Sequence, residues 1–214
     1  MNLGVVLERV FAGEASDVPD DPTATKILDA AVGACAASGI GALTIDGVAR
    51  RAGVNRTTIY RRFGDRDGVL QAMTLREGER MAQGIMKSLE GVEDPAEQLV
   101  EGFAAAVRLT EAHPVIRRTA EFEPQDLIAA GLADEAALLR LGSSFAAAGV
   151  RKLQLDGRAT HLDADAIGET MARLFASFVL IPAQYSIDVR SEAGARSYAR
   201  RTLVPLLLGS AGNA

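Results

Sequence analysis

Residues 45–60 restrict the fold more than any other stretch, because they meet the steric demands of two short helices that cross at a tight turn. Ala49 is small at the place where the two backbones must approach each other. Gly53 follows four residues later, where the turn needs a positive φ that glycine adopts at little cost. The inward positions of both helices are apolar: Ile45, Val48, Val54 and Ile59. This spacing predicts a helix-turn-helix unit.

The outward face of the same unit is a row of hydrogen-bond donors: Arg50, Arg51, Arg56, Thr57, Thr58 and Arg61. Arginine forks match guanine edges, threonine can touch a thymine methyl group or a phosphate, and Tyr60 can donate to a phosphate oxygen. The helix N-terminus also attracts phosphate. A solvated basic helix without a partner would carry the same arginines, so the turn and the inward residues are what favour DNA.

Charge is distributed unevenly along the 214 residues. Residues 44–66 hold six arginines against two aspartates, although the whole chain has a formal net charge of −5. A basic face on an acidic chain favours a polyanion at one place and repels it elsewhere.

Composition is that of a folded globular protein, with 48% hydrophobic and 24% charged residues. The single cysteine, Cys35, excludes a disulfide framework within the chain. The apolar runs are shorter than the roughly 18 residues that a membrane span needs, and the N-terminus lacks the pattern of a secretory signal. We therefore expect a cytoplasmic protein with no membrane partner.

Nearly every segment has helical spacing, and about nine helices are expected in an all-α chain. Residues 12–22 are rich in acidic residues and prolines and are expected to form a linker. Thr23 or Thr25 should cap the first helix, and a later helix should run from Pro124 to about Gly149. Another should start after Asp163 and reach Pro182 or slightly beyond. The other expected caps are Thr44, Asn55, Asp65, Asp94 and Ser191.

The segment LTIDGVARRAGVNRTTIYRRFGDRDGVL, residues 43–70, resembles the DNA-binding signature of the TetR family of bacterial transcriptional regulators. The matching features are the A-x-x-A-G-V turn, the T-x-Y-x-x-F recognition helix and a basic residue three positions after the phenylalanine. The resemblance implies three parts: an extension and linker (1–22), a three-helix helix-turn-helix DNA-binding domain (23–72), and a helical effector-binding and dimerisation domain (73–214). It also implies a homodimer that binds a pseudo-palindromic operator in double-stranded DNA, and we expect a repressor released by a small, apolar effector of unknown identity.

The resemblance also implies roles for single residues. Thr44 would cap its helix and contact phosphate, and Asn55 would cap the recognition helix. Arg66 stands where the family usually has a lysine that holds a phosphate. Gly68 departs from the commoner residue at its position and should cost about 1 kcal/mol of helix propensity relative to alanine. Base reading would fall to Arg56, Thr57 and Thr58, and the groove wall to Tyr60 and Arg61.

In the second domain, five phenylalanines could line an effector cavity or form ordinary core: Phe103, Phe122, Phe145, Phe175 and Phe178. Small residues at four-residue spacing in the helix after Asp163 permit close helix approach, either between subunits or within one chain. The residues expected at a dimer interface are Gly168, Met171, Ala172, Phe175, Tyr198, Leu203 and Leu206.

An enzyme is disfavoured, because the chain has one cysteine, two separated histidines (His113 and His161) and no glycine loop that could hold a phosphate after a strand. Glu121 and Glu123 lack a third group at ligand spacing, so we expect no metal site and no cofactor. A helical adaptor that uses its basic helix on an acidic protein is the remaining alternative. A gel-shift series would separate it from a DNA-binding protein.

Overall fold

The computed structural model describes residues 21–157, 160–181 and 188–208. Within these ranges all regular structure is helical, which confirms the all-α class. The helices are α2 (Pro22–Ser38), α3 (Ile45–Ala52), α4 (Arg56–Phe63), α5 (Arg66–Ser88), α6 (Pro95–Ala112), α7 (Pro114–Phe122), α8 (Pro124–Leu155), α9 (Ala164–Leu180), α10 (Glu192–Tyr198) and α11 (Val204–Leu208). Residues 1–20 of the expected extension and linker (1–22) lie outside the described residues, as does the helix end near Pro182. The last two residues of that segment instead cap and begin α2.

The helix starts follow the side-chain caps, and two boundaries differ from expectation. Asp21, not Thr23 or Thr25, caps α2, because its carboxylate accepts the backbone N–H of Thr23 at 2.9 Å and Pro22 then occupies the first helical position. Helix α8 passes through Gly149 and ends at Leu155. The glycine that follows its C-terminus at positive φ (72°) is Gly157. The expected caps that do accept backbone N–H groups are Thr44, Asn55, Asp65, Asp94, Asp163 and Ser191.

The last helix is continuous from α10 to α11 through a π-helical segment, Ala199–Leu203. Val204 N–H donates to the carbonyl of Ala199, five residues back. Pro205 follows directly and has no N–H, so this shift in hydrogen-bond register falls where the helix cannot continue normally. With these segments counted as one, the described residues contain nine helices.

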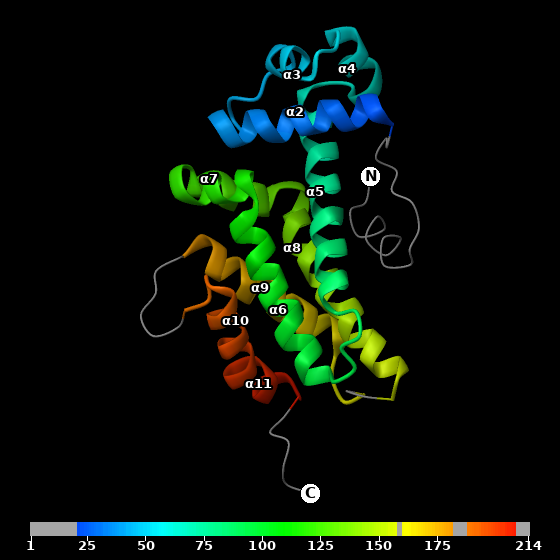
Figure 1. Cartoon of the computed structure of the whole chain (residues 1–214), viewed down its shortest axis with the longest axis vertical. Coiled ribbons are helices and arrows are strands. Elements are labelled where there is room, and N and C mark those ends of the chain that lie inside the picture. The colour runs from blue at the N-terminus through cyan, green and yellow to red at the C-terminus, as the bar shows by residue number, and fades with distance from the viewer. Residues whose placement is uncertain (1–20, 158–159, 182–187, 209–214) are drawn as a thin grey trace, which may run out of the picture.

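Helices α2, α3 and α4 pack with the first turns of α5 to form one end of the molecule, here called the head (Figure 1). Helix α5 runs from the head along α6 into the remaining helices, here called the body (Figure 1). Helix α7 lies beneath α2, and its Val115 is buried in the head core. The other buried head residues include Ile27, Leu28, Cys35, Val48, Ile59, Val69 and Met73.

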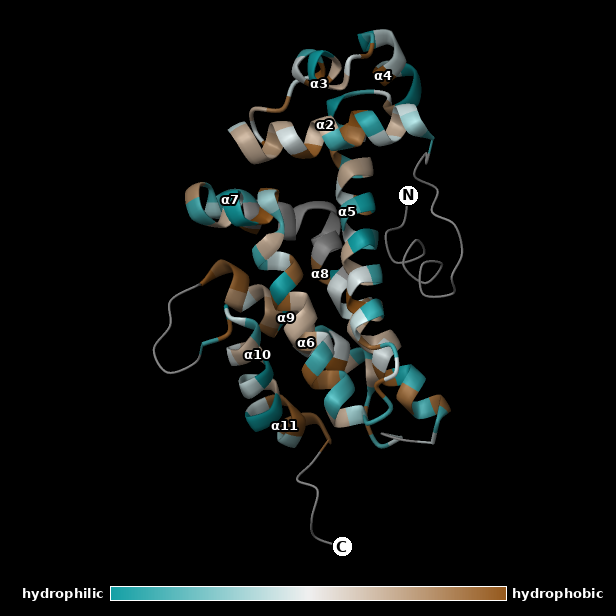
Figure 2. Ribbon diagram, viewed as in Figure 1, coloured by the Kyte–Doolittle hydropathy of each residue, from teal (hydrophilic) through white to brown (hydrophobic). Residues whose placement is uncertain are grey.

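An aromatic cluster forms the centre of the body core between α6, α9 and α10. The ring centre of Phe103 lies 6.3 Å from that of Phe175, 6.1 Å from that of Phe178 and 5.7 Å from that of Tyr198. The contacts of Phe103 with Phe175 and Phe178 are edge-on, and such contacts stabilise a core beyond the area they bury. Figure 2 shows hydrophobic residues concentrated in α11 at the C-terminal end of the body and hydrophilic ones along α3 and α4.

Helices α8 and α9 pack very closely against each other. A Cβ atom added to Gly168 of α9 would lie 2.4 Å from the carbonyl oxygen of Ser143 and 2.9 Å from the Cβ of Ala147, both in α8. One turn later, Ala172 lies against Gly142. The small residues of α9 therefore serve packing within one chain.

Candidate functional site

The turn between α3 and α4 has the geometry expected from its sequence. Gly53 adopts the left-handed conformation (φ 67°, ψ 34°), and Val54 N–H donates to the carbonyl of Ala49 at 3.0 Å. Ala49 is buried at the crossing of the helices. Thr44 Oγ1 accepts the backbone N–H of Gly47 at 3.1 Å and thereby caps α3.

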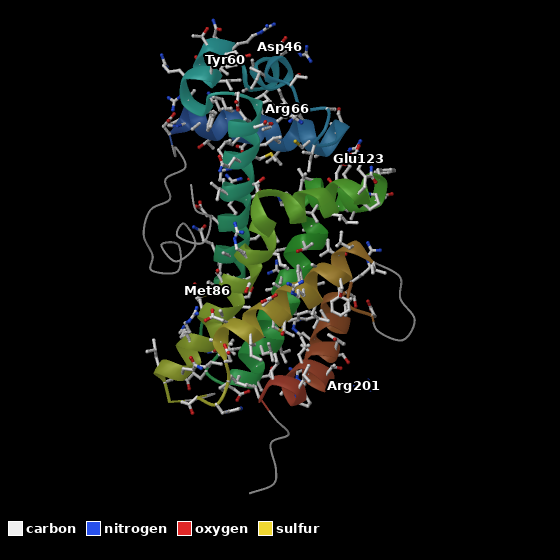
Figure 3. All side chains as sticks on the ribbon, turned by 180° about the vertical axis from the view of Figure 1, so that it is seen from behind. Asp46, Tyr60, Arg66, Met86, Glu123 and Arg201 are labelled. Carbon is white, nitrogen blue, oxygen red and sulfur yellow. The ribbon has the colours of Figure 1, made fainter. Side chains whose placement is uncertain are left out.

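Helix α4 is buried on one side and exposed on the other. Ile59 is fully buried and Phe63 packs against the head core. Asn55 Oδ1 accepts the backbone N–H of Thr57 at 3.1 Å, which caps the helix. Tyr60 is 52% exposed at the end of the molecule formed by α3 and α4 (Figure 3). Also exposed on this helix are Arg56, Thr57 and Arg61, and Thr58 is partly buried.

Three arginines of the head are free or only weakly held. Arg50 and Arg61 are exposed and make no ion pair with other described residues. Arg56 Nε lies 2.6 Å from the carboxylate of Asp46, and both side chains are more than half exposed. An exposed pair of this kind contributes little stability. Arg56 can therefore exchange Asp46 for another partner at little cost.

The other arginines of the head are bound to α2 and the loop after it. The Arg66 guanidinium donates to the carbonyl of Leu43 at 3.0 Å and to that of Ile40 at 2.9 Å. Arg62 is paired with Asp21, the cap of α2. Arg51 lies against Gly33, where an added Cβ would be 2.6 Å from its Nε. The sequence pattern did not predict these contacts. Arg66 and Arg51 contact uncharged groups, and Asp21 is 41 residues away from Arg62 in the chain.

A cavity of about 820 Å³ lies between α5, α6, α8, α9 and α11. Three of the five expected phenylalanines line it, namely Phe103, Phe145 and Phe175. Phe178 instead packs in the aromatic cluster. Phe122 departs from the expectation altogether, because it is 65% exposed at the end of α7, with the Arg118 guanidinium 5.5 Å from its ring centre.

The residues expected at a dimer interface are mostly used within the chain. Gly168 and Ala172 pack against α8, and Met171, Ala172 and Phe175 line the cavity. Tyr198 is partly buried in the aromatic cluster and Leu203 is 1% exposed. Leu206, in contrast, is 68% exposed on α11. Within one chain, the close helix approach at the small-residue face of α9 is to α8.

A polar cluster joins the head to the body. Glu77 of α5 lies 3.4 Å from His113 Nε2, at the junction of α6 and α7, and 2.9 Å from Arg76. Arg76 in turn binds Asp29 of α2 at 2.9 Å. Burial alone would raise the pKa of Glu77, but the hydrogen bond from His113 and the charges of Arg76 and Arg80 outweigh it and lower that pKa.

A second contact between the two parts lies at the C-terminal end of α2. The Glu123 carboxylate, between α7 and α8, packs so close to Gly39 that an added Cβ would be 2.4 Å from it (Figure 3). Arg118 lies 3.6 Å from the same carboxylate. Gly39 has a φ of 89°, a conformation that favours glycine, whereas the flexible Glu123 side chain could move to admit a larger residue.

Two further observations concern other classes of site. No helix among the described residues is long and apolar enough to cross a membrane. Within the same residues, no three histidine, cysteine, aspartate or glutamate side chains gather in a group that could hold a metal ion.

The model of the bacterial regulatory proteins of the tetR family matches residues 27–73, the head and its junction with α5. The HTH-type transcriptional regulator AlkX of Mycobacterium tuberculosis (strain ATCC 25618 / H37Rv) is 29% identical over 153 residues, which cover 71% of this chain and 72% of that protein.

Solved structures show the same fold over most of the chain. The TetR family repressor AlkX from Dietzia sp. strain DQ12-45-1b, implicated in biodegradation of n-alkanes, has a TM-score of 0.60 at 23% identity and covers 85% of this chain and 95% of that one. The fatty acid degradation regulator FadR from Bacillus halodurans has a TM-score of 0.57 at 19% identity, with 91% and 100% covered.

Proposed function

Because this chain belongs to the TetR family of bacterial regulatory proteins, we propose that it is a repressor that binds its operator as a homodimer and leaves it when a small apolar effector binds. Its relatives are transcriptional regulators, not enzymes. Two-fold symmetry implies a pseudo-palindromic operator whose half-sites lie about 34–36 Å apart. We place the protein in the cytoplasm, where such an operator is accessible.

The exposed donor face of α4 carries the proposal. We assign base reading to Arg56, Thr57 and Thr58, because they lie at the N-terminal end of a helix whose opposite side is buried through Ile59. Tyr60 and Arg61 are assigned to phosphates along the groove. The N-terminal ends of α3 and α4, with their caps Thr44 and Asn55, would face phosphates as well.

Arg66 needs a separate assignment, since its guanidinium is already used within the head. Its bonds to the carbonyls of Ile40 and Leu43 hold the loop that ends at Thr44. The remaining nitrogen, Nη1, lies 3.1 Å from the Asp67 carboxylate. We propose that Arg66 positions Thr44 first and approaches a phosphate only through Nη1.

For the dimer we propose a four-helix interface made by α9 and the continuous helix α10–α11 of each subunit. The faces of these helices that stay exposed in one chain support this choice, since they include an apolar residue, Leu206, among small and polar ones.

We retain residues 23–72 as the DNA-binding domain and 73–214 as the effector and dimer domain. Effector binding is assigned to the cavity, through Phe103, Phe145 and Phe175.

The class of effector follows from the lining of the cavity, which is aliphatic and aromatic along most of its length. The solved AlkX repressor is implicated in n-alkane biodegradation, and the solved FadR protein is a regulator of fatty acid degradation. Both observations support an effector with a long hydrocarbon part.

The test is a gel-shift series on sites found by mapping where the protein binds across its own genome. The protein should prefer one palindrome over random duplex at physiological salt, and the effector should release it. Discrete binding sites with release would separate a repressor from a helical adaptor, which would bind an acidic protein and show no preferred duplex. Absence of discrete sites would contradict the proposal.

A further inference from the structure

An acidic side chain, Asp46, lies among the exposed donors of α3 and α4. Residues 44–66 contain two aspartates, and the other one, Asp65, accepts a backbone N–H at 2.9 Å as the cap of α5. Helix α3 is already capped by Thr44. Asp46 lies in the first turn of α3 with 54% of its side chain exposed, at the same end of the molecule as Tyr60 (Figure 3). A carboxylate at this place opposes phosphate binding.

Asp46 is paired with the arginine that we assign to base reading. Its one ion pair with a described residue joins its Oδ1 to Arg56 Nε at 2.6 Å. Arg50 and Arg61 are exposed and have no acidic partner in the described part of the chain. Their full charge suits phosphate, whereas the charge of Arg56 is partly balanced by the carboxylate.

The pairing changes which acceptor Arg56 prefers. Breaking the pair costs little in water, but the carboxylate then stays beside any phosphate that replaces it and repels that phosphate. A guanine edge presents the uncharged acceptors O6 and N7, which arginine binds in a bidentate manner. The terminal nitrogens Nη1 and Nη2 lie beyond the Nε that faces Asp46 and carry most of the guanidinium donors. Arg56 can thus bind guanine without leaving Asp46.

We propose that Asp46 is a positioning residue for operator recognition, which directs Arg56 to a guanine in each half-site and away from phosphate. The inference rests on the proposed function, because it takes α4 as the recognition helix. It adds the base that Arg56 reads and the residue that sets this preference.

The experiment compares wild-type protein with Asp46→Asn on two duplexes. One is the duplex that the wild-type protein selects most strongly from a randomised library, and the other has a random sequence. Asp46→Asn should bind the random duplex more tightly and narrow the ratio of the two affinities roughly 3- to 10-fold. On the random duplex, the slope of log K against log salt should steepen by about 1 per subunit, because Arg56 gains a phosphate. Gel shifts over a range of salt concentrations measure both effects.

Asp67→Asn is the matched control. It removes the same charge from another exposed aspartate of the head, but its partner Arg66 is held by backbone carbonyls. Its affinities for the two duplexes should rise together and leave their ratio unchanged. Asp46→Glu, which keeps the carboxylate, should stay close to wild type. In an Arg56→Ala background, Asp46→Asn should no longer change the ratio, because Asp46 acts through Arg56.

Equal ratios for Asp46→Asn and Asp67→Asn would overturn the inference. Weaker binding of Asp46→Asn to both duplexes would also overturn it, since a carboxylate that only stabilises the N-terminal end of α3 gives that result. In both cases the wild-type protein still selects a duplex, so the proposed function stands. A wild-type protein that selects no duplex contradicts the proposed function and this inference together.

Discussion

At the scale of single residues, the arginines of the head have two different tasks. Arg50, Arg56 and Arg61 are exposed and free or held only by a weak surface pair. Arg62 and Arg66 are bound to Asp21 and to backbone carbonyls, so they stabilise the head. The sequence shows one basic cluster, but only the contacts reveal which charges are available to DNA.

We predict that Arg56→Ala weakens operator binding by about 1–3 kcal/mol and relaxes preference at one base position. The reason is the exposed position of Arg56 in the first turn of α4, where breaking its weak pair with Asp46 costs little. Gel shifts on operators that vary at each position measure both effects. Arg151→Ala is the control, since it breaks an exposed pair with Asp165 in the body. Equal weakening on all sequences would mean that Arg56 contacts only phosphate.

The role of Gly68 in the structure differs from the one expected from its sequence position. Helix propensity alone makes it a weak point of α5, worth about 1 kcal/mol. In the structure, a Cβ atom at this position would lie 1.8 Å from the carbonyl oxygen of Phe63, at the end of α4. Glycine is therefore required for α4 and α5 to approach each other.

Gly68→Ala should consequently lower the free energy of unfolding by about 1–3 kcal/mol, because the backbone must shift to admit the methyl group. Gly149→Ala is the matched control. Gly149 lies inside α8, where an added Cβ would meet no atom within 4 Å. This variant should raise the free energy of unfolding by up to about 1 kcal/mol. Urea denaturation followed by circular dichroism measures both values. A Gly68→Ala protein as stable as the Gly149→Ala protein would refute the steric argument.

At the scale of helices, the sequence predicts starts better than ends. A start depends on one local side chain, and Thr44, Asn55 and Asp94 each cap as expected. An end depends on which glycine adopts a positive φ, and packing against α9 carries α8 past Gly149. The two candidate sites also differ in how far the sequence predicts them. The recognition helix follows from local spacing, whereas the lining of the cavity depends on contacts between distant helices.

The contact between α5 and the junction of α6 and α7 should depend on pH. His113 Nδ1 accepts the backbone N–H of Ile116 at 3.4 Å, which leaves its other nitrogen to donate to Glu77. Because the pKa of Glu77 is lowered in the folded protein, its contribution is fully present above the pKa of the unfolded chain. It is lost as pH falls through the lower, folded value.

Wild-type protein should therefore lose more stability between pH 6 and about pH 3.5 than Glu77→Gln does. At pH 6 the variant should already be less stable by about 1–3 kcal/mol, because it loses a charge-assisted contact. Glu169→Gln, which removes an exposed pair with Arg173, should follow the wild-type curve closely. Thermal unfolding across this range would show the difference, and parallel curves for wild type and Glu77→Gln would contradict the argument.

At the scale of the whole molecule, α5 belongs to both functional parts. Its first turns place Val69 and Met73 in the head core, and its second half lines the cavity through Met81, Ala82 and Ile85. Helix α7 makes the second connection through Val115. Under the proposed function, an effector would act by binding the form that cannot engage DNA more tightly than the form that can. To shift the equilibrium between these two forms 100-fold, the effector must bind one form about 2.7 kcal/mol more tightly than the other.

Such coupling is reciprocal, so operator DNA must weaken effector binding by the same factor by which the effector weakens DNA binding. We predict that Val115→Ala reduces this factor, because it loosens the contact of α7 with the head. Val107→Ala is the control, since both valines are 6% exposed but Val107 lies in the body core. Each change should cost about 1–3 kcal/mol of stability. Titrating an effector that releases the wild-type protein, with and without operator, measures the factor. Equal factors for the two variants would exclude α7 as a route between cavity and DNA and leave α5 to carry the coupling.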